Sequence, residues 1–188
     1  MGIIFWLILL ALAAYGVMLF NGLVNIKNNV SKAWANIDVL LKQRHDELPK
    51  LIDTCKQYMQ HEQVTLEKVI QARSQVSAAR ESQNLGALGA AEGTLRTGLG
   101  QLFAVAEAYP DLKANEQFLH LQTRISGLEN AISDRREFYN DSVTINNTGI
   151  EEFPALIIAR LFNFKPFEVL KFAVEELKDV DVGARFKS

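Results

Sequence analysis

Apolar residues follow two different patterns along the chain. Residues 3–20 read IIFWLILLALAAYGVMLF, a run of 18 residues without a charge. At about 1.5 Å per residue, a helix of this length spans roughly 27 Å, close to the ~30 Å hydrocarbon core of a bilayer. Because the run is apolar on every side, it predicts a transmembrane anchor over residues 1–22.

A cleaved signal peptide is the alternative reading of this segment. Residues 11–13, ALA, resemble a cleavage site, but no Lys or Arg precedes them and the apolar run continues for seven residues beyond them. A signal peptide carries a basic amino-terminal region and a short apolar core. The sequence therefore favours an uncleaved anchor, with membrane lipid as its partner.

Basic residues lie on one side of the predicted anchor. None precedes it, and the first four that follow are Lys27, Lys32, Lys42 and Arg44. Because Lys and Arg favour the cytoplasmic side, we expect a single-pass cell-membrane protein with its amino terminus outside. The chain after Asn21 is then cytoplasmic, and a lone cysteine, Cys55, fits a reducing compartment.

Beyond the anchor, apolar residues recur every three or four positions. One row falls seven residues apart at Leu23, Val30, Ile37, Arg44, Leu51 and Tyr58, and a second includes Ala33, Trp34, Leu41, Leu48, Cys55, Val69 and Val76. Such rows are typical of a coiled coil or helical bundle. They predict one helix over about 23–80, kinked at Pro49, because no Gly, Asn or Ser cluster around Pro49 indicates a turn.

Two further long helices are predicted after a loop at 81–86. The first covers about 86–107 and ends before the turn at Tyr109 and Pro110. The second covers about 112–146, and residues 146–149, NNTG, are expected to end it. Its apolar row is Phe118, Leu121, Ile125, Leu128, Ile132, Arg135, Tyr139 and Ser142.

The last part of the chain predicts a short carboxy-terminal helical segment. Phe153 and Pro154 precede the apolar residues ALIIARLF, and an amphipathic stretch covers 167–178. No run alternates with a period of two. The predicted fold is therefore all-α, an antiparallel bundle of long helices over 23–150 behind the transmembrane helix, followed by the segment 151–188.

Composition excludes several classes of protein. The 188 residues carry 20 Lys and Arg against 22 Asp and Glu, a formal net charge of -2. A strong nucleic-acid binder needs a basic excess, so nucleic acid is not an expected partner. A single cysteine excludes a disulfide framework within the chain and a multi-cysteine zinc site.

Motifs that suggest catalysis lack residues that the chemistry requires. His61 and Glu62 begin a zinc-protease pattern, but Thr65 stands where its second His is required. Residues 93–98 have the glycine spacing of a P-loop without the Lys and Ser or Thr that must follow. We therefore expect no catalytic residues, no cofactor and no metal site.

Remaining polar and small residues fit packing roles. His45, Asp46 and Glu47 are consecutive, so they point about 100° apart on a helix and do not face one ion. Cys55 is expected to be a buried thiol. The small residues at Gly86, Gly89, Gly93 and Thr97 predict close approach of a neighbouring helix.

Arg44 occupies an otherwise apolar position. We expect it to pair with an acidic residue of the third helix, such as Glu129 or Asp134. The alternative is a side chain whose guanidinium reaches water.

Taken together, the chain resembles the LemA family of bacterial membrane proteins. The resemblance is carried in order by residues 20–24, 30–52, 107–122, 129–143 and 153–164, with His61-Glu62 and Ala72-Arg73 between them. The signature positions are Asn21, Trp34, Asp38, Arg44, Pro49, Tyr109, Pro110, Arg135, Tyr139, Asn140, Phe153 and Pro154. Glu47, Lys50 and Gln57 depart from the family pattern, which puts the packing around Pro49 in question.

The resemblance implies a membrane helix followed by a helical bundle, with no enzymatic activity to transfer. Two function classes stay open. One is a non-enzymatic, membrane-anchored scaffold that forms a homo-oligomer and binds a protein partner of unknown identity. The other is a membrane-tethered enzyme or metal-dependent sensor with a site built from helix-borne polar residues. We also expect the segment from Phe153 to pack on a neighbouring subunit or on the bilayer, the alternative being that it caps its own bundle.

Overall fold

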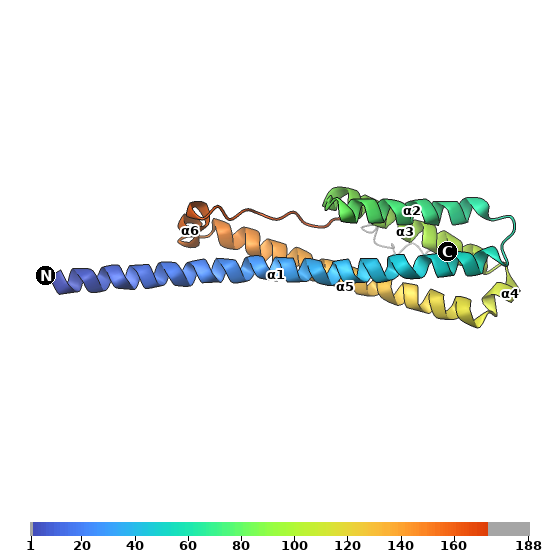
Figure 1. Ribbon diagram of the computed structural model, residues 1–188, viewed down its shortest axis with the longest axis horizontal. Helices are drawn as coiled ribbons and strands as arrows, with labels where there is room; N and C mark the ends of the chain where they lie inside the picture. Colours follow the sequence, from blue (N-terminus) through green and yellow to red (C-terminus); the bar gives the residue numbers. More distant parts are fainter. Residues whose placement is uncertain (1, 173–188) are drawn as a thin grey trace, which may run out of the picture. The chain divides into compact units, whose positions relative to one another are not determined.

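The structure, a computed structural model, describes residues 2–172 (Figure 1). Within them the chain is all-α, as predicted, and has no strand. The helices are α1 (Gly2–Lys56), α2 (Gln63–Glu81), α3 (Leu85–Ala106), α4 (Pro110–Lys113), α5 (Glu116–Glu151) and α6 (Ala155–Leu161).

The chain divides into two compact units that share the long helices α1 and α5. Unit 1 comprises residues 1–39 and 133–169, and unit 2 comprises residues 40–132 together with the chain from residue 170. Unit 1 therefore holds the apolar amino-terminal run and α6, whereas unit 2 holds α2, α3 and α4.

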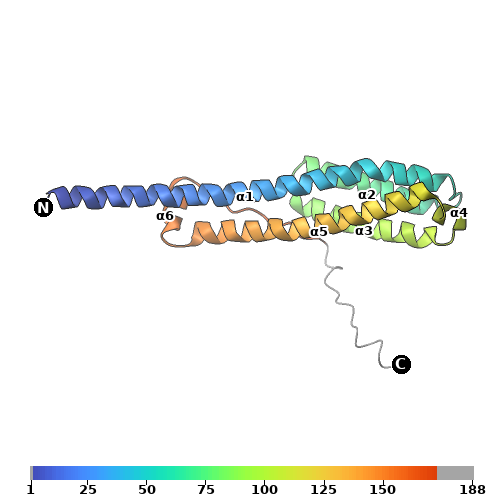
Figure 2. The same cartoon turned by 90° about the horizontal axis from the view of Figure 1, so that it is seen from below.

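The described part of unit 2 is a bundle of four long helical segments, with the short α4 between α3 and α5. They are residues 40–56 of α1, the antiparallel pair α2 and α3, and residues 116–132 of α5 (Figures 1 and 2). The predicted rows supply its core, which includes Leu41, Leu48, Leu51, Cys55, Val69, Val76, Leu88, Leu95, Leu99, Ile125 and Ile132. Burial of these side chains is the main force that holds the segments together.

The predicted continuous helix over 23–80 is wrong. α1 ends at Lys56, the chain turns through residues 57–62, and α2 begins at Gln63. Backbone N–H groups of Tyr58 and Met59 both bond the carbonyl of Cys55, which closes the end of α1. The turn, QYMQHE, contains neither Gly nor Pro, so no strong turn-forming residue marks it.

The turn was missed because the apolar row continues beyond it at heptad spacing. Cys55 and Val69 are 14 residues apart, which is two heptads, and both are buried. The heptad register of the apolar row is therefore the same before and after the turn, although its two parts lie on different helices. α1 passes through Pro49 as one helix and provides no hairpin there, as expected.

The predicted bounds of α3 are nearly correct. Its first turn is capped by Asn84, whose side-chain oxygen accepts a hydrogen bond from the N–H of Ala87 at 2.9 Å. Gly98, which was not among the small residues expected to allow close approach, faces Val69 of α2. Gly89 instead faces the backbone of Lys171, where a Cβ would lie 1.8 Å from the carbonyl oxygen. That glycine accommodates an extended segment and not a helix.

Unit 1 is built on the first part of α1, the last part of α5 and α6. Its small core joins Leu23, Ile150 and Ala159, with Ile158 and Phe164 packed against them. The residue window that is long and apolar enough to cross a membrane lies at the start of α1, and none of it is buried within the structure. The helix bundle therefore does not cover this segment.

α5 is longer than predicted. It passes through residues 146–149 and ends at Glu151, because the two asparagines bind the backbone of a following segment. Asn147 accepts from the N–H of Phe167 and donates to its carbonyl, both at 2.9 Å, and Asn146 donates to the carbonyl of Lys165 at 3.5 Å. These residues hold an extended segment along the helix, and they do not terminate it.

The structure differs from the prediction at Arg135 and at residues 167–172. Arg135 is exposed and does not continue the buried row, which passes through Tyr139, Ser142 and Val143 instead. The amphipathic stretch over 167–178 is not helical at residues 167–172, and the remainder lies outside the described residues. Leu170 is buried in unit 2, and Tyr139 donates to the carbonyl of Glu168 at 3.0 Å.

Candidate functional site: the polar cluster around Pro49

Pro49 creates a local need for a hydrogen-bond donor. A proline inside a helix has no N–H, so the carbonyl one turn earlier, that of His45, loses its usual partner. Arg73 of α2 supplies the bond: its Nε donates to the carbonyl oxygen of His45 at 3.0 Å. The side chain thus joins α2 to α1 at the point where the helix ladder is interrupted.

The same arginine also contacts the ring of His45. Nη2 of Arg73 lies 2.7 Å from Nε2 of His45, so the ring nitrogen accepts and the imidazole is neutral. Burial, and after it the charge of Arg73, lowers the pKa of His45 below its usual value. Its Nδ1 is buried without a hydrogen-bond partner among the described residues.

A buried ion pair lies one position before His45. Arg44 of α1 bonds Glu92 of α3 through Nη2 and Oε1, and both side chains are buried. Its Nη1 is also 3.8 Å from Oε1 of Glu129 on α5. The expected pairing with the third long helix is therefore confirmed for Glu129, whereas Asp134 is exposed and the water-facing alternative is wrong.

Within the described residues, Arg44 lies against two carboxylates, those of Glu92 and Glu129. Burial raises the pKa of Glu129, and the charges of Arg44 and Arg96 only partly oppose this effect. Arg44 Nε and Glu129 Oε1 make no hydrogen bond within the described part of the chain. Each unsatisfied buried atom costs about 1–3 kcal/mol, so the cluster fixes which helices meet more than it adds stability.

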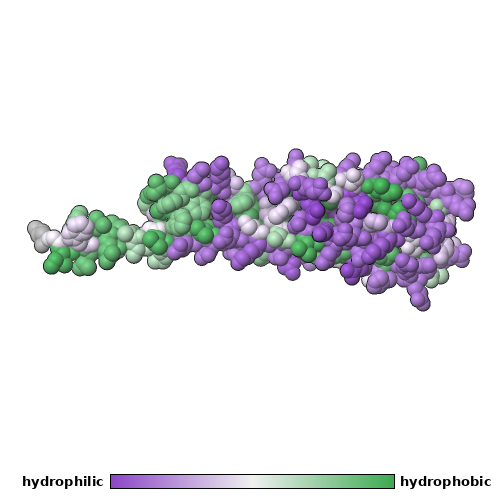
Figure 3. All heavy atoms as spheres, viewed as in Figure 1, coloured by the Kyte–Doolittle hydropathy of each residue, from purple (hydrophilic) through white to green (hydrophobic). Residues whose placement is uncertain are grey.

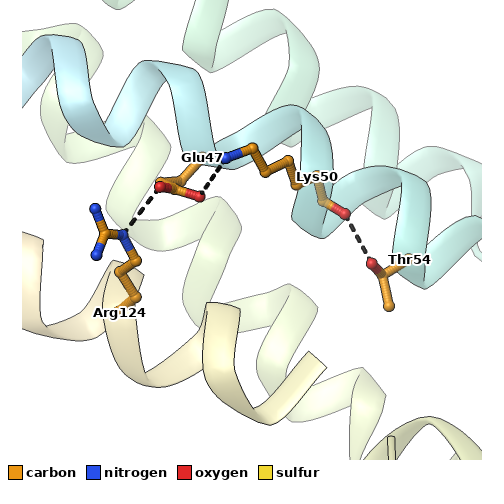
Figure 4. Close-up of polar contacts among 4 residues, drawn as sticks. All are labelled: Glu47, Lys50, Thr54 and Arg124. Atoms are coloured by element: carbon orange, nitrogen blue, oxygen red, sulfur yellow. Dashed lines mark hydrogen bonds and ion pairs between the residues drawn. The ribbon is translucent and has the colours of Figure 1, made fainter. Parts of the chain in front are cut away.

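Exposed charges form the rim of this cluster (Figure 4). Glu47 accepts from Nε of Arg124 at 2.9 Å and from Nζ of Lys50 at 3.1 Å, and Thr54 donates to the carbonyl of Lys50 at 2.8 Å. The hydrogen bond from Lys50 is the main reason that the pKa of Glu47 is lowered. Two of the three departures from the family pattern, Glu47 and Lys50, therefore bind each other.

Two hydrogen bonds join the turn after α1 to the region around α4. Tyr109, which precedes Pro110 at the start of α4, donates to Oε1 of Glu62 at 3.4 Å. Asn115 donates to the hydroxyl of Tyr58 at 3.0 Å. Burial raises the pKa of Tyr109, with Glu62 adding to the shift. Tyr109 therefore has a structural role at this end of unit 2.

The cluster offers little reactive chemistry. Cys55 is fully buried, as predicted, and desolvation raises its pKa to about 12, so it is a neutral thiol at physiological pH. Among residues 2–172, no three His, Cys, Asp or Glu side chains gather where they could hold a metal ion. The side chains of the cluster chiefly bind one another.

The signature positions are divided between the two units. Arg44 and Pro49 belong to the cluster in unit 2, and Tyr109 and Pro110 mark its far end. The others lie in unit 1, namely Asn21, Trp34, Asp38, Arg135, Tyr139, Asn140, Phe153 and Pro154. Trp34 is half-buried and packs edge-on against Tyr139, with ring centroids 5.7 Å apart.

Sequence reasoning missed the roles of Arg73 and Glu92. The signal for Glu92 was present, because it lies four residues after Leu88 and three before Leu95, within the apolar row of α3. The signal for Arg73 was the unpaired carbonyl that any helical proline leaves behind. Neither signal identifies its partner helix without the fold.

Comparison with known proteins agrees with this architecture. The LemA family model matches residues 33–183, and the chain belongs to the LemA family. Protein LemA of Metamycoplasma hominis is 29% identical over 185 residues, which is 95% of this chain and 82% of that protein.

Two magnetosome proteins are similar over a shorter stretch. MamQ of Magnetospirillum gryphiswaldense is 32% identical over 82 residues, 44% of this chain and 30% of that protein. MamQ 2 of Paramagnetospirillum magneticum is 34% identical over 82 residues, with the same coverage of both chains. The match therefore spans less than a third of each magnetosome protein.

Proposed function

We propose that this protein is a membrane-anchored, non-enzymatic scaffold of the LemA type. The observation that carries the proposal is an apolar segment at the start of α1 that no part of the described structure buries. A core helix of a soluble protein would be covered, and this one is continuous with the bundle helix of unit 2. Membership of a membrane-associated family supports the same conclusion.

The bundle presents surfaces for other proteins, copies of this chain included. Anchoring confines copies to one membrane and raises their effective concentration, which favours weak contacts between them. A groove on α2 and α3 offers polar and small side chains for such contacts, among them Lys68, Gln71, Gln75, Thr94 and Thr97. The cluster around Pro49 supports this surface by fixing α2 and α3 to α1.

A membrane-tethered enzyme or sensor is the less favoured function. Its best candidate site would be His45 with neighbouring carboxylates. However, Nε2 of His45 is taken up by Arg73, and the buried carboxylate of Glu92 is paired with Arg44. These groups are engaged with the protein itself, so none of them is presented to a substrate.

The anchor is tested by replacing Leu10 with Arg, and by Leu10→Phe as a matched control. An arginine at the centre of the span costs about 2.5–3.5 kcal/mol of insertion free energy, whereas phenylalanine is favourable. We expect Leu10→Arg to be released from membranes by carbonate and Leu10→Phe to remain. Equal retention of both variants would remove the basis of the proposal.

The assembly is tested on the wild-type protein from the same membranes. After mild detergent extraction and transfer to lipid discs, native mass spectrometry is expected to show more than one copy per particle. A monomer at all protein concentrations would leave the anchored bundle in place and would contradict the homo-oligomer.

A further inference from the structure

Large apolar side chains of α6 and of the residues flanking it are not covered by the described part of the chain. Ile157 and Leu161 are four residues apart, so they lie on one side of the helix, and their exposed fractions are 57% and 72%. Phe153, which precedes the helix, is 80% exposed. Phe162 is 55% exposed next to them. The opposite side of α6 is already used, because Ala155, Ile158 and Ala159 pack on Leu23 and Ile150.

This arrangement differs from ordinary exposed apolar residues. Other large apolar side chains outside the amino-terminal run, such as Val39, Val64, Leu119 and Ile145, are scattered over separate helix surfaces. Single exposed apolar residues need no explanation, whereas a contiguous apolar patch marks an interaction surface. On α6 and the residues flanking it, four large apolar side chains are exposed within ten residues.

The residues that follow α6 contact α1 at the end of the predicted membrane anchor. Phe162 and Phe164 pack on Phe20, with ring centroids 4.7 and 5.8 Å apart. Phe20 is the last residue of the uncharged run, so α6 lies where the predicted anchor leaves the hydrocarbon core. Figure 3 shows the hydrophobic surface of α6 next to that of the amino-terminal part of α1.

The charges around α6 fit the same boundary. Lys27 lies 6.0 Å from the ring centroid of Phe164, and Arg160 and Lys165 are exposed. Long basic side chains extend toward lipid headgroups while their stems cover apolar surface. Glu151 and Glu152, which directly precede Phe153, are also exposed, so acidic and basic side chains both lie around α6.

We propose that α6 is an interfacial membrane helix, and that its Ile157 and Leu161 insert into the bilayer beside the anchor together with the flanking Phe153 and Phe162. It holds unit 1 against the membrane at a second point. The inference rests on the proposed membrane anchor and adds a lipid-binding surface that is separate from it. Insertion of apolar side chains to the depth of the acyl boundary is how amphipathic helices bind membrane surfaces.

The experiment uses the full-length protein in lipid discs and an environment-sensitive fluorophore on single introduced cysteines. The native Cys55 is buried, so it does not compete for the label. The labelled variants are Leu161→Cys on α6, Val17→Cys in the anchor and Thr144→Cys on the exposed face of α5. Doxyl lipids quench only labels that reach the acyl region.

We expect loss of emission at residues 161 and 17 and none at residue 144. Quenching at residue 17 without quenching at residue 161 would overturn the inference about α6 and leave the anchor intact. No quenching at either position would instead contradict the proposed membrane anchor.

A second measurement separates lipid from a neighbouring copy. Oxidative crosslinking of Leu161→Cys in the same discs is expected to give no dimer, because residue 161 faces lipid. Efficient crosslinking together with an unquenched label would show that a second copy covers α6, which would overturn the inference.

Discussion

A single proline determines much of the polar chemistry in unit 2. Because Pro49 leaves the carbonyl of His45 without its helical donor, a side chain from elsewhere must supply one. Arg73 does so at 3.0 Å and is joined to the ring of the same histidine. A feature that weakens α1 in isolation thus becomes a specific attachment point for α2.

A double-mutant cycle tests this dependence. We expect Arg73→Met to lower the free energy of unfolding by about 1–3 kcal/mol, because the buried carbonyl is left unpaired. In a Pro49→Ala background the alanine N–H bonds that carbonyl, so the same change is expected to cost about 1 kcal/mol less. Urea unfolding of the full-length protein in detergent, followed by circular dichroism, measures both values.

Arg124→Met is the matched control for this cycle. Arg124 also binds α1, through Glu47, but its side chain is exposed, so its loss is expected to cost about 0–1 kcal/mol. That cost is not expected to depend on residue 49. An equal loss of unfolding free energy from Arg73→Met with Pro49 and with Pro49→Ala would show that the unpaired carbonyl of His45 is not the reason for the contact.

At the scale of helices, apolar spacing predicted which residues are buried better than where helices end. The row from Leu23 through Val30, Ile37 and Leu51 is buried as predicted, because one face of a helix must meet the core. The turn at 57–62 was missed because the row resumes two heptads later on α2. Spacing alone cannot distinguish a continuous helix from two helices in register.

At the end of α5, local residue preference predicted a helix end that the structure does not have. Asparagine and glycine predict a helix end from local preference, yet Asn146 and Asn147 lie inside the helix. Their side chains bind the backbone of residues 165–167, a partner about 20 residues away that no local pattern reveals. The contacts of Arg73 and Glu92 with α1 were missed for the same reason, since each joins two different helices, whereas the pairing of Arg44 with Glu129 was predicted.

Replacing Asn147 with Ala tests its role in holding the extended segment. The change removes two hydrogen bonds to Phe167, worth about 1 kcal/mol each. We expect amide hydrogen exchange in residues 163–169 to accelerate by roughly 5–30-fold, measured by mass spectrometry on the full-length protein. Thr144→Ala, which removes only a bond to its own helix, is expected to leave that segment unchanged. Unchanged exchange in Asn147→Ala would contradict the role.

At the scale of the whole molecule, the end of α1 at Lys56 removes one reason to expect association. A single helix over 23–80 would be longer than either of the two predicted helices that follow it and would leave part of its apolar row exposed, whereas the chain turns after Lys56 and α2 supplies the second part of that row. Among the described residues, exposed large apolar side chains are concentrated at the start of α1 and around α6. Both lie in unit 1, so we expect the membrane to cover more of this apolar surface than a neighbouring bundle does.

The side of the membrane on which unit 2 lies is a separate prediction. Lys27, Lys32 and Lys42 are exposed and follow the anchor, whereas no basic residue precedes it. Because positively charged residues are retained in the cytoplasm, unit 2 is expected there and the amino terminus outside. The buried Arg44 is already paired within the bundle, so the three lysines carry this argument.

Single introduced cysteines test this orientation in intact cells. Gly2→Cys places an exposed thiol before the anchor, and Ser74→Cys places one on α2 of unit 2. Cys55 is fully buried and its pKa is raised to about 12, so the native thiol gives no background. A membrane-impermeant maleimide is expected to label residue 2 in intact cells and residue 74 only after lysis. Labelling of residue 74 without lysis, with residue 2 protected, would reverse the orientation and place the bundle outside the cytoplasm.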